Sequence, residues 1–142
     1  MNRYALVYPM AAMVVLTAIV LGRMFLGRVR GVKRGEVDVR YYKTYQGDGE
    51  PRSMAQHSRH FVNLFENPVL FYAACVVAMV TGQGTGAIVW LAWAYVACRI
   101  GHAFVHLGSN RIPPRIAMYA AGWTMLLAMW GVLVFGVAAH GQ

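Results

Sequence analysis

Four long apolar segments, separated by polar stretches, constrain the fold of this chain more than any other feature. They cover residues 6–25, 61–80, 87–107 and 115–139, and each has about the 20 residues that an α-helix needs to cross a bilayer. The composition agrees, because 58% of the 142 residues are hydrophobic. The sequence therefore predicts an all-α integral membrane protein, a four-transmembrane-helix bundle formed by a single domain over residues 1–142.

The basic residues are distributed as in a membrane protein. Of the 13 Lys and Arg residues, all except Arg3 lie in the ranges 23–59 and 99–115. Because basic loops stay in the cytoplasm, the loop over residues 26–58 and the turn after the third helix are expected there, with both termini on the other side. The short turns favour a bacterial inner membrane. The basic residues separate apolar spans and do not form one face of a soluble fold, so an anionic lipid surface is expected as a neighbour and nucleic acid is not.

Two polar stripes stand at the cytoplasmic ends of the second and third helices. One consists of Arg59, Asn63 and Glu66, and the other of Arg99, His102 and His106. In each stripe the residues are three or four positions apart, so they share one face of a helix. Polar side chains are costly inside a membrane, and each stripe therefore requires a partner or a function.

Two interpretations of these stripes remain open. In the first, Glu66 and Arg99 form a buried ion pair that holds the second helix against the third. In the second, the stripes bind a charged ligand that enters from the cytoplasm. The cations outnumber the single carboxylate, and further cations follow at Arg111 and Arg115, so this ligand would be an anion.

Other groups in the chain carry less information. His102 and His106 are four residues apart and could present two imidazoles to one ion, but no Cys or Asp accompanies them and the nearby arginines repel cations, so no metal or haem is expected. We expect the remaining histidines at solvent or at the membrane interface; these are His57, His60 and His140. Cys75 and Cys98 are expected to be small buried hydrophobic residues.

The polar residues also resemble the motifs of a known family. Arg59, Asn63, Glu66 and Pro68 form R-x-x-x-N-x-x-E-x-P, which resembles the signature of the membrane-associated proteins in eicosanoid and glutathione metabolism (MAPEG). The segment RIGHAFVHLGSNRIPPRIAMY, residues 99–119, is similar to the third-to-fourth-helix region of the microsomal prostaglandin E synthase and glutathione transferase-like branch. The resemblance covers nearly the whole chain.

This resemblance implies a homotrimer that binds glutathione, its co-substrate, between subunits near the cytoplasm. It implies a glutathione-dependent transferase or peroxidase that acts on lipophilic electrophiles or lipid hydroperoxides, with Arg115 as the catalytic residue that stabilises the glutathione thiolate. The implied glutathione-binding residues are Arg59, Asn63, Glu66, His102, His106, Arg111 and Tyr119. The alternative is a non-catalytic protein of the same fold that binds lipid or a partner, so the resemblance leaves open whether the chain is an enzyme.

Two departures limit what the resemblance implies. His106 and Ile116 stand where the prostaglandin synthase branch has Tyr and Ser. A histidine can still donate a hydrogen bond to a carboxylate, although its charge depends on pH, but isoleucine removes a hydroxyl near the sulfur. Prostaglandin synthesis is therefore not expected. An arginine near the end of the first helix, Arg28 or Arg30, is a further candidate for the site.

Overall fold

The chain forms four long helices and one short one. The computed structural model describes residues 4–45, 50–84 and 86–140, without the side chains of residues 52, 53, 57 and 140. The helices are α1 (Val7–Lys33), α2 (Tyr41–Thr44), α3 (Arg52–Val80), α4 (Ala87–Leu107) and α5 (Ile112–His140). The four long helices are each apolar enough to cross a membrane, and the described residues contain no strand. The predicted all-α integral membrane bundle is therefore confirmed.

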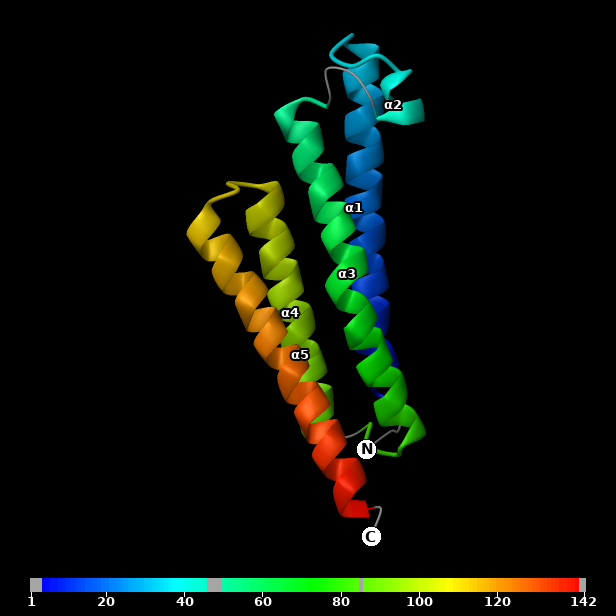
Figure 1. Ribbon diagram of the computed structural model, residues 1–142, viewed down its shortest axis with the longest axis vertical. Coiled ribbons are helices and arrows are strands. Elements are labelled where there is room, and N and C mark those ends of the chain that lie inside the picture. Colours follow the sequence, from blue (N-terminus) through cyan, green and yellow to red (C-terminus); the bar gives the residue numbers. More distant parts are fainter. Residues whose placement is uncertain (1–3, 46–49, 85, 141–142) are drawn as a thin grey trace.

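The long helices run alternately up and down, in two hairpins. α1 packs mainly against α3 and α4 mainly against α5, while α3 contacts both α4 and α5. Figure 1 shows that the α1–α3 connection and the α4–α5 turn lie at the same end of the bundle, and that both chain ends lie at the opposite end. We call the end with the α1–α3 connection and the α4–α5 turn the basic end, because it carries most of the arginines and lysines.

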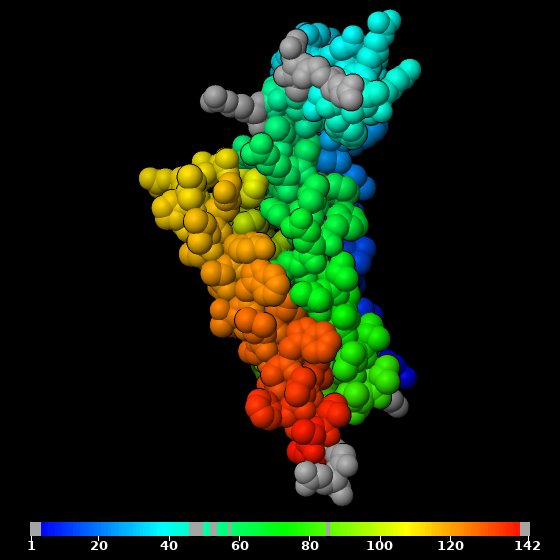
Figure 2. Space-filling model, in the orientation of Figure 1, coloured from blue at the N-terminus to red at the C-terminus, as the bar shows by residue number. Residues whose placement is uncertain are grey.

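Helices α1 and α3 are much longer than the sequence predicts, and α5 begins three residues earlier, at Ile112. α1 continues to Lys33 and α3 begins at Arg52, so the connection spans residues 34–51 and not 26–58. At 1.5 Å per residue, the 29 residues of α3 reach about 43 Å, which exceeds a hydrocarbon core of about 30 Å. The charged ends of both helices therefore extend beyond the hydrocarbon, where charge does not prevent helix formation. Figure 2 shows the α1–α3 connection projecting beyond the α4–α5 turn.

An ion pair fastens this projecting connection to the bundle. Arg28 Nε lies 2.9 Å from Glu50 Oε1, and Arg28 Nη2 donates to Ser58 Oγ at 3.0 Å. Ser58 Oγ in turn donates to Glu50 Oε2 at 2.8 Å. The sequence-based candidate Arg28 thus holds α1, the connection and α3 together, while Arg30 is exposed.

All four long helices contribute side chains to the core, and one polar link joins α3 to α4 inside it. The rings of Phe71 and Tyr95 stack with centroids 4.5 Å apart. The Tyr95 hydroxyl donates a hydrogen bond of 2.6 Å to Asn67 Oδ1, and both residues are buried. Cys75 is buried in this core as predicted, and Cys98 is half-buried; both thiols are free.

Candidate functional site

A cavity of about 940 Å³ opens at the basic end, between the start of α3, the end of α4 and the start of α5. It is the place where the two predicted polar stripes meet. Polar and apolar side chains from these three helices and from the α4–α5 turn line it. The lining residues are Ala55, Gln56, Arg59, Val62, Asn63, His102, His106, Asn110, Arg115, Ile116 and Tyr119.

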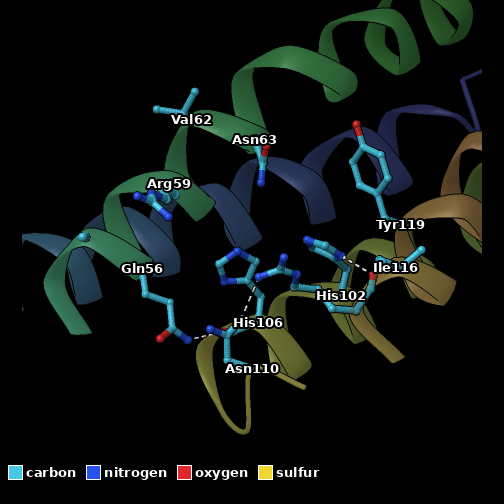
Figure 3. Close-up of a pocket in the computed structure, with 11 residues that line it drawn as sticks. Gln56, Arg59, Val62, Asn63, His102, His106, Asn110, Ile116 and Tyr119 are labelled. Carbon is cyan, nitrogen blue, oxygen red and sulfur yellow. Dashed lines mark hydrogen bonds between the residues drawn. The ribbon is translucent and has the colours of Figure 1, made fainter. Parts of the chain in front are cut away.

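Helix α3 contributes one stripe of side chains to the cavity. Gln56, Arg59 and Asn63 follow each other at intervals of three and four residues, so they share one side of the helix. Figure 3 shows Asn63 directed into the space that His102 and His106 enter from α4. Gln56 Nε2 donates a hydrogen bond to the backbone carbonyl of His106, and this bond joins the two helices at the rim.

Helix α5 and the preceding turn close the opposite wall. Asn110 adopts a positive φ of 48°, a conformation that Asn tolerates better than most residues, and this conformation turns the chain from α4 into α5. Arg115 Nη1 donates to Asn110 Oδ1 at 3.0 Å, which fixes the position of the guanidinium. His102 Nδ1 lies 3.1 Å from the Arg115 carbonyl oxygen. The guanidinium at the start of α5 is therefore tied to the turn, and the backbone of the same residue is tied to α4.

Arg99 lies inside the bundle and does not line the cavity. It is 1% exposed, and its Nη2 donates to the backbone carbonyl of Asn63 at 3.2 Å. Its guanidinium carbon lies 5.9 Å from the centroid of the Tyr119 ring, within the range of a cation–π contact. Arg99 thus connects α3, α4 and α5 directly behind the cavity.

The predicted ion pair between Glu66 and Arg99 is wrong for the single chain. Among the described residues, the ion pairs are Arg28–Glu50 and Arg34–Glu36. Glu66 is exposed, because the stripe that it shares with Arg59 is turned away from the buried side of α3. The buried side carries Leu64 and Phe71, well over a quarter-turn away. Arg99 therefore bonds a carbonyl in place of a carboxylate.

The structure brings together most, but not all, of the residues that the resemblance implies. Those at the cavity are Arg59, Asn63, His102, His106, Arg115 and Tyr119. Glu66 and Arg111 are exposed and do not contribute to the lining. A site made within one chain therefore lacks one predicted carboxylate and one predicted cation.

Three polar residues of this region were not predicted from the sequence. Gln56 and Asn110 line the cavity, and His60 is completely buried beside it. The expectation that His60 lies at solvent or the interface is wrong, while the side chains of His57 and His140 lie outside the described residues. The sequence does contain a pattern that indicates the burial of His60. This residue stands four residues before Leu64, in the apolar stripe that continues to Phe71, and therefore lies on the inner face of α3.

The lining combines positively charged, polar and apolar side chains. It includes two arginines and two histidines, and no acidic side chain from the described part of the chain contributes to it. Val62 of α3 and Ile116 of α5 line the cavity but remain 53% and 57% exposed, so apolar surface borders the cavity on both of these helices. Such a site attracts a small anion and offers an apolar partner a route to it.

Comparison with known proteins gives one match. The sequence model of the MAPEG family matches residues 6–135. Among curated proteins and among solved structures, no significant match was found.

Proposed function

The chain belongs to the MAPEG family, whose members include glutathione-dependent transferases and also non-catalytic proteins, and we propose that it is a glutathione-dependent transferase or peroxidase. Its substrates would be lipophilic electrophiles or lipid hydroperoxides. The observation that carries the proposal is the cationic cavity at the basic end, in which Arg59, Asn63 and Arg115 from α3 and α5 face the two histidines of α4.

The charges of the cavity suit glutathione. At neutral pH this tripeptide carries two carboxylates and one ammonium group, so its net charge is negative. Arg59 can bind one carboxylate through charge-assisted hydrogen bonds, and the Asn63 amide and the Tyr119 hydroxyl can bind its peptide groups. His102 and His106 complete the polar wall. These contacts would place the cysteine sulfur near the start of α5.

Arg115 would act on the sulfur by electrostatics. The thiolate is the reactive form, and a free thiol with a pKa near 8.5 is mostly protonated at neutral pH. A guanidinium beside the sulfur stabilises the thiolate and lowers the thiol pKa. An arginine stays protonated and so is no general base. The bond from Arg115 to Asn110 orients the guanidinium before substrate binds, as electrostatic catalysis requires.

Two reactions follow from one thiolate. With an electrophilic carbon, sulfur forms a C–S bond and the leaving group departs with the bonding electron pair. With a lipid hydroperoxide, sulfur attacks the terminal oxygen, the O–O bond breaks, and the alkoxide takes up a proton to give an alcohol. The resulting sulfenic acid then condenses with a second glutathione to give the disulfide and water. The lipophilic partner would enter between Val62 and Ile116.

We also propose that three copies of the chain complete the site. Glu66 and Arg111 are exposed, yet each is close in sequence to a residue that lines the cavity, Asn63 and Asn110 respectively, so a neighbouring subunit could reach them. In a homotrimer, Glu66 of one subunit would bind the glutathione ammonium in its neighbour's cavity. The excess of Arg and Lys at the basic end favours a cytoplasmic location for this end, and we propose that the membrane is a bacterial inner membrane.

The test is glutathione-dependent turnover by the purified protein. We expect conjugation of an aryl halide or reduction of a lipid hydroperoxide, with Arg115→Ala lowering kcat/KM about 100-fold or more. Arg34→Ala is the matched control, because the Arg34 side chain is 71% exposed and does not line the cavity, and this variant should retain full activity. Equal loss in both variants, or no turnover over a broad panel of electrophiles, would contradict the proposal.

The exposure of Glu66 and Arg111 favours one alternative, a non-catalytic protein that binds lipid or a partner. Thermal unfolding with glutathione separates the two. A ligand at 100 times its Kd adds about 2.7 kcal/mol to the free energy of unfolding, so millimolar glutathione should raise the melting temperature of the wild type, and less so that of Arg115→Ala. An unchanged melting temperature would favour the non-catalytic alternative.

A further inference from the structure

Three buried histidines meet at the inner wall of the cavity. His60 comes from α3, and His102 and His106 come from successive turns of α4. One ring nitrogen of each lies within 4.8 Å of the corresponding nitrogens of the other two. The ring centroids are 4.8 to 5.6 Å apart, and all three side chains are at most 5% exposed. The proposed chemistry of glutathione uses no such cluster and leaves His60 without a role.

The hydrogen bond of His102 prepares this ring to bind a cation. A carbonyl oxygen only accepts hydrogen bonds, so His102 Nδ1, 3.1 Å from the Arg115 carbonyl oxygen, must carry the proton. In the neutral ring Nε2 then holds a free lone pair. Nε2 is buried, and no hydrogen-bond partner for it occurs in the described part of the chain. A ring whose second nitrogen bonds a backbone carbonyl is the usual arrangement of a metal-binding histidine.

We propose that His60, His102 and His106 form a site for a divalent transition metal of the zinc class. Zinc binds histidine nitrogens at 2.0–2.1 Å, so three ligands in a tetrahedral site are ~3.4 Å apart. The nitrogens of the cluster would close by ~1.5 Å, which rotation about the side-chain bonds of His60 and His106 can provide. Since His102 and His106 also line the cavity, the fourth position faces it and is open to water or an anion.

The ligand set decides which metals fit. Three imidazoles without a carboxylate suit Zn²⁺, Cu²⁺, Ni²⁺ and Co²⁺ and exclude Mg²⁺ and Ca²⁺, which bind oxygen ligands. The buried guanidinium of Arg99 and the guanidinium of Arg115 reduce the affinity for a cation. An anion at the open position offsets this repulsion, so the site should bind metal more tightly when a small anion is present.

Metal binding can be tested without glutathione or any electrophile. Untagged protein, purified in detergent after treatment with a chelator, would be titrated with Co²⁺ and with Cu²⁺. We expect one equivalent per chain, with the strong visible absorption of tetrahedral Co²⁺ and displacement by Zn²⁺. His60→Gln and His106→Gln should each weaken binding 10-fold or more. Cys98→Ser, the control for binding through a thiol on α4, should bind as the wild type does.

The wild type alone also provides a test, which matters if a histidine variant does not fold. The paramagnetic resonance spectrum of bound Cu²⁺ reports the number of nitrogen ligands, and three are expected. Absence of stoichiometric binding, a spectrum with one nitrogen or none, or binding lost in Cys98→Ser and retained in His60→Gln would each overturn the proposal. Failure of glutathione turnover would leave this result unaffected, because the binding assay contains no substrate.

Discussion

The hydrogen bond between Tyr95 and Asn67 links α3 to α4 inside the membrane, and its removal gives a sharp prediction. Tyr95→Phe deletes only the hydroxyl that donates to Asn67 Oδ1 at 2.6 Å. The stacking on Phe71, at 4.5 Å and 12° between ring planes, should persist because the rings have the same shape. The variant therefore measures the bond separately from the packing.

The expected loss in the free energy of unfolding depends on the Asn67 amide, which stays buried after the Tyr95 hydroxyl is removed. Hydrogen bonds between helices in a membrane contribute about 0.6 kcal/mol on average and up to about 1.7. Asn67 is 2% exposed, and its Nδ2 already lacks a partner among the described residues. Loss of the Tyr95 hydroxyl would also leave Asn67 Oδ1 without a side-chain partner, which adds a desolvation penalty. We expect Tyr95→Phe to reduce the free energy of unfolding by about 1–2 kcal/mol.

Reversible unfolding in mixed detergent and SDS micelles would measure this change. Tyr72→Phe is the matched control, since Tyr72 is half-buried and its hydroxyl has no hydrogen-bond partner in the described part of the chain. Replacing both partners by apolar residues removes the unsatisfied group, so Tyr95→Phe with Asn67→Leu should destabilise less than the sum of the single changes. The reasoning would be refuted if Tyr95→Phe left the free energy of unfolding unchanged, or if the double variant lost the sum of the two single losses.

Further stability predictions concern the turns and the connection. Gly86→Ala should destabilise the protein by about 1–2 kcal/mol, because Gly86 has a φ of 57°. Gly131→Ala, in the middle of α5 with no atom within 4 Å of the added Cβ, should stabilise it by about 0.5–1 kcal/mol; the same unfolding assay measures both, and the opposite order would contradict the argument. Arg28→Ala should release the connection, because Glu50, with a side chain only 6% exposed, loses its ion pair, and limited proteolysis should then cut between residues 34 and 51 faster than in the wild type. An unchanged cleavage rate would mean that the ion pair does not hold the connection.

The sequence predicts the membrane spans well because length and apolar composition determine them. The bounds of α4 are as predicted, since Gly86 and Gly108 interrupt the chain at both ends. The end of α1 and the start of α3 differ from the predicted bounds. Hydropathy marks where a helix leaves the hydrocarbon and not where the helix itself stops. The charged residues 26–33 and 52–60 continue as helix outside the bilayer.

The site could be predicted only in part, because spacing shows which residues share a face but not where that face points. Arg59, Asn63 and Glu66 do share a stripe, as expected, yet only the first two line the cavity. The inward direction of α3 is set by Leu64 and Phe71. His60 belongs to the same inner stripe, and its proposed role in metal binding becomes visible only when α4 brings two further histidines beside it.

The exposed Val62 and Ile116 in the lining of the cavity predict a kinetic property of the proposed enzyme. A substrate that arrives between them is drawn from the bilayer, so the relevant quantity is its mole fraction in the membrane and not its molarity in the assay. Adding empty vesicles or extra detergent micelles at constant total substrate should then slow turnover by surface dilution, with the maximal velocity unchanged. Rates measured at one lipid content would be misleading if compared between laboratories, unless both report the ratio of substrate to lipid.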